Sequence, residues 1–207
     1  MSEAKTGKPV VAAFDFDGTL TRHDTMFPFL LHTVGWSKFI RHVTMLLPTL
    51  TGYGLGTIRN DIAKERVFVR FLSGMDIGAL KDKGAQFAEK KLPGLLRPEA
   101  MQRLAWHKQQ GHHCVVISAS LELYVKPWAQ QAGFDGVIAT HLEMLDDGHT
   151  TGKLSGKNCF GPEKVRRLEE LLGSKSAYTL YAYGDSRGDR ELLSAADFAY
   201  YREMPGS

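Results

Sequence analysis

The sequence has few cysteines and little net charge. Among its 207 residues are two cysteines, and 26 basic residues stand against 23 acidic ones, giving a net charge of +3. Cys114 lies in a strand-like stretch and Cys159 in a loop-like one, so a disulfide framework is not expected. The small positive charge is too little to indicate a nucleic-acid-binding protein, and we expect no nucleic-acid partner. Internal repeats and low-complexity segments are absent, and Met1–Lys5 lacks an apolar signal core, which predicts a cytoplasmic protein.

What the sequence does contain is an apolar run that ends in two carboxylates. Val10–Phe14 has the pattern of a buried parallel strand, and Asp15 and Asp17 follow it directly. Alternation along an extended chain sends both aspartates to the same side, with Phe16 opposite. Ligands of open α/β sheets bind beyond the carboxyl ends of the strands. This run therefore predicts a functional site built around the two acids.

Two neighbouring carboxylates repel each other unless a cation or a partner neutralises them. Mg²⁺ suits this role, because it is a hard cation that prefers carboxylate and water oxygens. The alternatives are a strand-ending turn with two solvated acids, or the start of a calcium loop. Thr19 and Thr21 stand where a calcium loop would carry further ligands, which disfavours that alternative.

Two downstream segments predict phosphate-binding groups. The apolar stretch His113–Ile117 is followed by Ser118, Ala119 and Ser120. A hydroxyl group beside the free backbone N–H groups at the start of a helix is typical of a phosphate-binding site. The alternative for Ser120 is a helix N-cap. Pro162 begins a second helix, with Lys164 in its first turn, where a cation opposes the helix dipole and an anionic partner becomes more plausible. Lys157 is the alternative candidate for the phosphate-binding lysine.

A third strand-like stretch, Tyr178–Tyr183, ends in a loop that carries Asp185 and Asp189. From Arg97 onward, strand-like and helix-like stretches alternate, which is typical of a doubly wound parallel sheet. Residues 141–154 break this rhythm and predict a β-hairpin. Acids again follow a strand, so this loop is expected to join the same site.

These motifs, in this order, resemble those of the haloacid dehalogenase-like (HAD) phosphatases. The motifs are Asp15-x-Asp17-Gly18-Thr19, Ser118, Lys164, and Gly184-Asp185-x-x-x-Asp189. The stretch from Asn158 to Val165 and the long insert after the first motif resemble subfamily IB, the phosphoserine phosphatase-like branch. The resemblance implies an α/β fold, a Rossmann-like doubly wound parallel sheet with a helical cap inserted after the first strand. We expect a catalytic core of residues 1–23 and 93–207 and a cap of residues 24–92.

The resemblance also implies a role for each motif residue. Asp15 would be the nucleophile and Asp17 the general acid and base, while Ser118, Ala119 and Lys164 would hold the phosphate. The implied cofactor is Mg²⁺, bound by the Asp15 side chain and the Asp17 backbone carbonyl, and also by Asp185 and Asp189. Residue chemistry agrees, because phosphoryl transfer needs in-line positioning and cations around the equatorial oxygens. Dehalogenases of the wider family lack the second aspartate.

The cap is expected to select the substrate. Asp24 lies where phosphoserine phosphatases have a glutamate that reads the substrate amine, and Arg66 resembles their cap arginine, which pairs with the substrate carboxylate. The alternative for Arg66 is a helix-surface residue paired with Glu65 or Asp61. Two positions depart from that pattern. Asp24 is shorter than glutamate, and Gly188 replaces the usual asparagine before the last aspartate.

The cap also contains an apolar stretch without charge. Residues 42–58 lack Asp, Glu, Lys and Arg, and they include Leu46, Leu47 and Leu50. Pro48 and several glycines make an uninterrupted membrane helix a poor interpretation. The first interpretation is burial of the stretch against the core, and the alternative is a surface that meets lipid.

Taken together, the residues predict a Mg²⁺-dependent phosphomonoester hydrolase that works through an aspartyl-phosphate. Its expected partner is a small phosphorylated substrate such as phosphoserine. Two alternatives are open. One is a lipid-phosphate phosphatase acting on phosphatidylglycerophosphate at a membrane surface. The other is a non-catalytic module that binds a metal or a phosphate.

Overall fold

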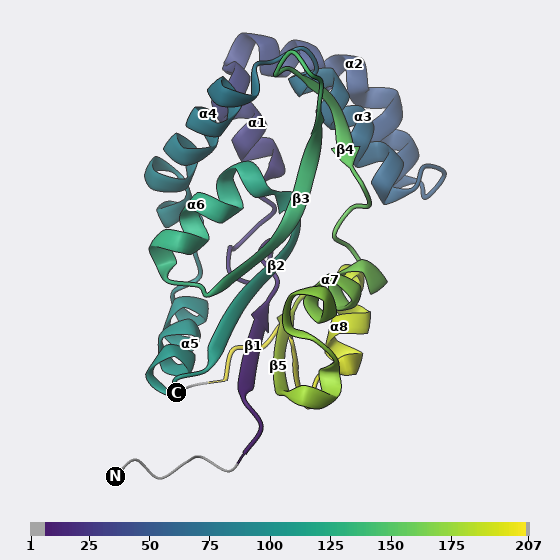
Figure 1. Ribbon diagram of the computed structural model, residues 1–207. Helices are drawn as coiled ribbons and strands as arrows, with labels where there is room; N and C mark the ends of the chain where they lie inside the picture. Colours follow the sequence, from purple (N-terminus) through teal and green to yellow (C-terminus); the bar gives the residue numbers. More distant parts are fainter. Residues whose placement is uncertain (1–6, 206–207) are drawn as a thin grey trace.

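The structure is a computed structural model that describes residues 7–205 (Figure 1). Its centre is a six-stranded sheet with the strand order β4-β3-β2-β1-β5-β6, in which β4 alone is antiparallel to its neighbour. The strands are β1 Val10–Phe14, β2 His113–Leu121, β3 Gly136–Met144, β4 Thr150–Ser155, β5 Thr179–Gly184 and β6 Phe198–Tyr201. The expectation about Met1–Lys5 concerns residues outside the described range.

Helices cover both faces of the sheet. Helices α5 and α6 lie on one face, and α7 and α8 lie on the other (Figure 1). Their bounds are α5 Pro98–Gln109, α6 Glu122–Ala132, α7 Pro162–Leu172 and α8 Arg190–Ala195, and two short 3₁₀ helices, η2 Lys175–Ala177 and η3 Arg187–Asp189, flank β5. The prediction of a doubly wound α/β fold is therefore confirmed.

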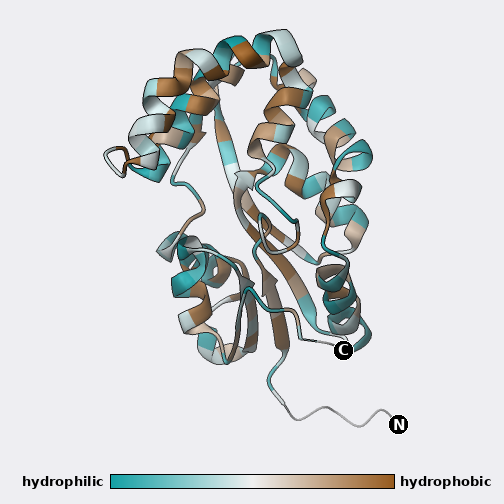
Figure 2. Cartoon of the chain, turned by 180° about the vertical axis from the view of Figure 1, so that it is seen from behind, coloured by the Kyte–Doolittle hydropathy of each residue, from teal (hydrophilic) through white to brown (hydrophobic). Residues whose placement is uncertain are grey.

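Strand β1 contributes side chains to the hydrophobic cores on both faces of the sheet. Ala12 and Phe14 pack into the cluster under α5 and α6, whereas Val11 and Ala13 pack into the cluster under α7 and α8. This alternation is the period of two that an extended chain imposes. The strand is apolar (Figure 2), and all of its residues after Val10 are buried. A buried first strand fixes the position of the acids that follow it.

The predicted insert forms four helices between β1 and α5. They are α1 Met26–Val34, α2 Trp36–Gly54, α3 Asn60–Leu72 and α4 Ile77–Lys90, followed by the 3₁₀ helix η1 Leu92–Leu95. Thr21 and Leu96 form an isolated antiparallel bridge, so the two ends of the insert lie side by side. No helix within residues 7–205 has both the length and the apolar character needed to cross a membrane.

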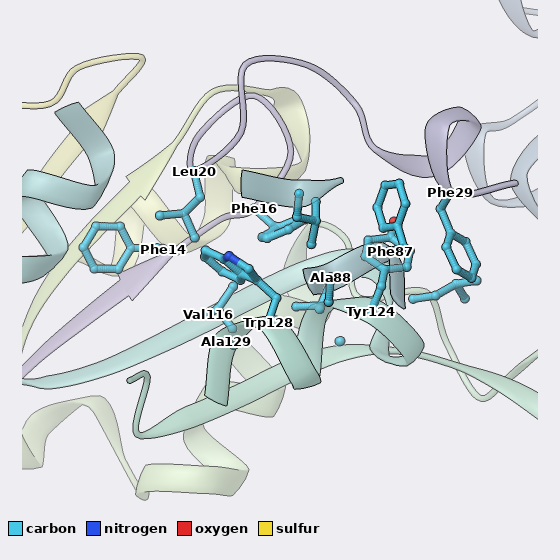
Figure 3. Close-up of a cluster of buried hydrophobic side chains, with 14 of the residues drawn as sticks. Phe14, Phe16, Leu20, Phe29, Phe87, Ala88, Val116, Tyr124, Trp128 and Ala129 are labelled. Carbon is cyan, nitrogen blue, oxygen red and sulfur yellow. The ribbon is translucent and has the colours of Figure 1, made fainter. Parts of the chain in front are cut away.

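The cap helices share a core with the sheet domain (Figure 3). The ring of Tyr124, from α6, lies 4.6 Å from the ring of Phe29 in α1 and 5.4 Å from that of Phe87 in α4. The ring of Phe16, just after β1, packs 5.1 Å from Trp128. Aromatic pairs at these distances add to the stabilisation given by burial. Helices α1 and α4 are thus held firmly against the core.

The antiparallel pair β3–β4 confirms the predicted hairpin and supports the cap from the other side. Backbone hydrogen bonds join it to the α3–α4 connection: Gly74 N donates to Thr150 O at 2.8 Å, and Ile77 N donates to Gly148 O at 3.0 Å. The boundary between core and cap at residues 24 and 92 stays a prediction. The cap contacts the rest of the protein both through these hydrogen bonds to the β3–β4 hairpin and through the shared aromatic core, so it is not a separate unit.

Candidate active site

The carboxyl ends of β1, β2 and β5 open into a cleft of about 1030 Å³ between the sheet and the cap. Most of the residues predicted as functional line this cleft. They are Asp15, Asp17, Asp24, Ser118, Ala119, Lys164 and Asp185. Neighbouring parallel strands end at the same edge of a sheet, which explains why motifs about 100 residues apart in sequence meet here.

Asp15 and Lys164 form an ion pair at the floor of the cleft. The Lys164 ammonium lies 2.5 Å from Asp15 Oδ1 and 2.6 Å from Asp189 Oδ1, and it also donates to Ile117 O at 3.1 Å. The Lys164 side chain is 2% exposed, so its charge acts mainly on the groups at the bottom of the cleft. Burial lowers the pKa of Lys164, but the charges of Asp15 and Asp189 outweigh burial and raise it. Lys164 is therefore a permanent cation.

Helix α7 positions Lys164 through its N-terminus. Gly161 takes a positive φ of 62° before the helix, and Pro162 occupies the first turn. The fallback, Lys157, is exposed and lies outside the cleft lining. Its carbonyl accepts a hydrogen bond from Arg167, which anchors the loop before α7. Lys164, and not Lys157, is therefore the lysine that reaches the cleft.

The loop after β5 brings two more acids to Asp15. Asp189 is fully buried, and its Oδ2 accepts hydrogen bonds from the backbone N–H groups of Asp185 and Ser186, at 3.1 and 3.0 Å. Carboxylate oxygens of Asp15, Asp185 and Asp189 all lie within 4.8 Å of one another. Asp185 is half-buried and faces the cleft, whereas Asp189 also holds Lys164.

These three carboxylates fit a magnesium ion. Lys164 supplies one positive charge against three acids, so the cluster is short of positive charge. Burial is the largest cause that raises the pKa of Asp15 to about 7, despite the opposing effect of Lys164. Burial likewise raises the pKa of Asp185. A divalent cation with hard oxygen ligands would relieve this shortage.

Asp17 points to the other side of the cleft, towards the cap. Its Oδ1 accepts from Thr25 N at 2.8 Å and from Thr25 Oγ1 at 2.6 Å, and its Oδ2 accepts from Ser120 Oγ. Burial, followed by the nearby charge of Asp24, raises the pKa of Asp17 to about 6. The Asp17 carboxyl is held in place by three donors and does not join the carboxylate cluster. This position suits proton transfer to a group that sits above Asp15.

The end of β2 differs from the sequence expectation in one respect. The strand continues to Leu121, and the N-cap of α6 is Leu121 rather than Ser120. Ser120 uses its hydroxyl to hold Asp17, so the N-cap alternative for Ser120 is wrong. Ser118 is fully buried as a residue, and its Oγ accepts from Ser120 N at 2.9 Å. Ser118 and Ala119 both line the cleft.

The structure does not bring Arg66 into the cleft. Arg66 is exposed on α3, and Lys64, two residues earlier, lines the cleft instead. The Lys64 ammonium donates to Ala119 O at 2.7 Å. Burial lowers the pKa of Lys64, while the charges of Asp17 and then Asp24 act in the opposite direction. Asp24 is exposed at the rim, where its Oδ1 accepts from Met26 N at 2.8 Å.

Lys64 was missed from the sequence, although a signal was present. Positions 64, 67, 68 and 71 fall on one helical face, and Val67, Phe68 and Phe71 are buried. Arg66 points away from that face. The periodicity of α3 thus places Lys64 on the inner side of the cap.

Two glycines of the site lie very close to other side chains. A Cβ on Gly18, whose φ is +76°, would lie 2.3 Å from Asp185 Oδ2. Gly18 therefore lets Asp185 reach the cluster. A Cβ on Gly188 would lie 2.5 Å from Cε2 of Phe160, a cleft residue. A side chain at position 188 would therefore require the exposed Phe160 ring to move.

The arrangement of Asp15, Lys164 and the acidic loop at the strand ends has a counterpart among known proteins. The family model of haloacid dehalogenase-like hydrolases matches residues 12–194, nearly the whole chain. The chain belongs to the haloacid dehalogenase-like hydrolases. Protein CicA of Caulobacter vibrioides (strain NA1000 / CB15N) is 38% identical over 201 residues, covering 96% of this chain and 88% of CicA.

Solved structures with this fold include two useful comparisons. A protein of unknown function from Bordetella pertussis Tohama I matches with a TM-score of 0.78 and 24% identity, over 91% of this chain and 87% of that one. A phosphoserine phosphatase, solved as a phospho-aspartyl intermediate analogue, matches with a TM-score of 0.60 and 17% identity, over 92% and 84% of the two chains. These likenesses show the fold.

Curated relatives matched over less than half of the chain carry phosphatase names. The predictions of a HAD fold of the phosphoserine phosphatase type and of a phosphatase are confirmed.

Proposed function

We propose that this phosphatase is a Mg²⁺-dependent phosphomonoesterase that works through an aspartyl-phosphate on Asp15. The observation that supports the proposal most is that Asp15 contacts Lys164 at the cleft and lies beside the carboxylates of Asp185 and Asp189. The Asp17 carboxyl is held separately, by Thr25 and Ser120. A carboxylate becomes an effective nucleophile when it is aimed and its charge is managed. The related phosphoserine phosphatase solved as a phospho-aspartyl intermediate analogue has the same fold.

In the proposed reaction, an Asp15 oxygen forms a bond to phosphorus as the bond from phosphorus to the substrate alcohol breaks. The Asp17 carboxyl gives its proton to the leaving oxygen, and the resulting carboxylate then takes a proton from the water that attacks the aspartyl-phosphate. Lys164 and the N–H groups around Ser118 and Ala119 stabilise the equatorial phosphoryl oxygens. Mg²⁺, held by Asp15, Asp185, Asp189 and the Asp17 carbonyl, would supply further positive charge.

The proposed substrate is a small phosphorylated metabolite with a second charged group. Lys64 offers a cation and Asp24 an anion on the cap side of the cleft. These two charges suit the carboxylate and the amine of a compound such as phosphoserine. Under this proposal, Lys64 takes the role that the sequence pattern gave to Arg66.

The proposal is tested by turnover of para-nitrophenyl phosphate with and without Mg²⁺, followed by a panel of phosphorylated metabolites. We expect Mg²⁺-dependent turnover and a preference for substrates that carry a carboxylate. Complete inactivity with every divalent metal tested would favour the non-catalytic binding module.

Replacement of Asp185 by asparagine is expected to weaken the magnesium site. The amide keeps the size of the side chain but removes one of the three clustered charges. The half-saturating Mg²⁺ concentration should rise by at least about 10-fold. The thermal stabilisation that Mg²⁺ gives to the folded protein should shrink in parallel, which provides a readout besides activity. Asp82→Asn, an exposed change on α4, is the control. Wild-type Mg²⁺ dependence in Asp185→Asn would remove Asp185 from the proposed ligand set.

The Lys64→Met change tests the cap cation. Methionine keeps an unbranched side chain but cannot pair with an anion. Loss of one partner of a desolvated charge pair costs about 2–5 kcal/mol. The kcat/KM for a phosphorylated amino acid should therefore fall about 30-fold or more relative to that for para-nitrophenyl phosphate. Arg66→Met, two residues away and exposed, is the matched control and should change this ratio less than about 2-fold. The opposite ranking would restore the original assignment of Arg66.

A further inference from the structure

The hydroxyl of Tyr124, a residue of α6, lies behind the Asp17 carboxyl. Tyr124 is 1% exposed and lies outside the cleft lining, so it can act on a reaction only through other residues. Its ring packs against the rings of Phe16, Phe29 and Phe87, at centroid distances of 6.3, 4.6 and 5.4 Å (Figure 3). Close packing on several sides fixes the position of the ring, and with it the position of the hydroxyl.

The Tyr124 hydroxyl reaches both side chains that hold Asp17. Its oxygen lies 3.1 Å from Thr25 Oγ1, and Ser120 is a second hydrogen-bond partner. Thr25 is the N-cap of α1, in the cap, whereas Ser120 belongs to β2. Thr25 holds Oδ1 of Asp17, and Ser120 holds Oδ2. One buried hydroxyl therefore connects the groups that support both carboxylate oxygens.

Each hydroxyl of this network has only one hydrogen to donate. The Thr25 hydroxyl donates to Asp17 Oδ1 at 2.6 Å, where the carboxylate oxygen can only accept. The hydrogen in the 3.1 Å contact must therefore come from Tyr124, whose O–H donates to Thr25 Oγ1. Tyr124 thereby keeps the Thr25 hydrogen directed at Asp17.

The two oxygens of Asp17 differ in the number of donors that they meet. Oδ1 accepts from Thr25 N at 2.8 Å and from Thr25 Oγ1 at 2.6 Å, which occupies both of its lone pairs. Among the described residues, Oδ2 accepts one hydrogen bond, from Ser120 Oγ, and so keeps a second lone pair. The proton that Asp17 gives to the leaving oxygen in the proposed reaction is therefore carried on Oδ2.

We propose that Tyr124 is a positioning residue for the Asp17 carboxyl, and that its hydroxyl acts through Thr25 and Ser120 to keep Oδ2 as the oxygen that transfers the proton. The proposal rests on the role in proton transfer that is proposed for Asp17, and it deepens that role. Misplacement of a reacting group by about 1 Å can cost about 100-fold in rate, so a residue that touches no substrate can still affect turnover.

The test replaces Tyr124 by phenylalanine, which keeps the packed ring and removes the hydroxyl. Phenyl phosphate and para-nitrophenyl phosphate differ only in the nitro group, and phenolate is the leaving group that needs the proton more. In Tyr124→Phe, kcat/KM for phenyl phosphate should fall about 10-fold, while kcat/KM for para-nitrophenyl phosphate should fall less than about 3-fold. Ser120→Ala removes a group that holds Asp17 directly and should show the same preference.

Tyr178→Phe is the matched control. The Tyr178 hydroxyl is also buried, but it has no hydrogen-bond partner among residues 7–205. This variant loses the same atom without loss of a hydrogen bond, so both kcat/KM values should change less than about 2-fold.

A double-mutant cycle tests the positioning without turnover. Unfolding by urea is measured for Tyr124→Phe, for Asp17→Asn and for the two changes combined. Because both residues belong to one hydrogen-bond network, the combined effect on the unfolding equilibrium constant should differ from the product of the single effects by at least about 3-fold. The same cycle with Tyr178→Phe in place of Tyr124→Phe should show no such difference.

Equal losses on both aryl phosphates in Tyr124→Phe would make Tyr124 a structural residue and overturn the proposal. Wild-type kinetics in this variant, or independent effects in the Tyr124 cycle, would overturn it as well. Failure of the proposed function has a different signature: Asp17→Asn would turn over phenyl phosphate like the wild type, while coupling in the cycle would still show that Tyr124 holds the carboxyl.

Discussion

Replacing Asp15 by asparagine is expected to lower phosphatase turnover by at least about 10⁴-fold, because loss of the nucleophile in a covalent mechanism can cost up to about 10⁶-fold. An amide has nearly the size of the carboxylate, so it fits the same space, but it cannot attack phosphorus. Lys164 keeps its second partner, since its ammonium lies 2.6 Å from Asp189 Oδ1. The measurement is kcat for para-nitrophenyl phosphate at saturating Mg²⁺.

The fold of this variant should remain. Asp15 is a buried acid whose pKa is raised chiefly by burial, so a neutral amide removes a costly buried charge. Loss of the Lys164 ion pair acts in the other direction, and we expect thermal stability near that of the wild type. Asp82→Asn serves as the control for the chemical change itself. Mass spectrometry must exclude conversion of the new asparagine back to aspartate. Near-native turnover in a verified sample would contradict the nucleophile assignment.

The motif residues could be predicted because each stands where a strand or a helix meets a loop. Asp15 and Asp185 lie just beyond the ends of β1 and β5, and Ser118 follows Val116, the last residue of β2 that pairs with β1. Such strand ends converge whatever the details of packing. Lys164 follows from a helix start marked by Pro162. The geometry of the sheet thus turns a linear order of motifs into one site.

The cap was harder to predict, because its site residues depend on how each helix is rotated. On α3, Lys64 and Arg66 are separated by about 200° around the helix axis, at 100° per residue. A sequence match selects Arg66, whereas the buried side chains of Val67 and Phe68 turn Lys64 inward. The contact of Phe160 with Gly188 was likewise invisible, since it joins two loops through side-chain packing.

Replacing Asp17 by asparagine is expected to lower turnover of alkyl phosphates by about 10²- to 10⁴-fold, which is the usual contribution of a general acid or base. The hydrogen bonds of this side chain can persist. Thr25 still donates to the remaining carbonyl oxygen, and the new amide nitrogen can donate to Ser120 Oγ. The change therefore removes proton transfer more than it disturbs the wall of the cleft.

The two steps of the reaction should respond differently in this variant. The para-nitrophenolate leaving group needs little protonation, so attack by Asp15 should still proceed on para-nitrophenyl phosphate. Hydrolysis of the aspartyl-phosphate needs the base and should become slow, which predicts a burst of one nitrophenolate per active site and phosphate trapped on Asp15. Acid quenching and peptide mass spectrometry measure the trapped group, and Asp15→Asn/Asp17→Asn is the control that should trap none. Equal losses on alkyl and nitrophenyl substrates, without a burst, would mean that Asp17 positions Thr25 and Ser120 rather than transferring a proton.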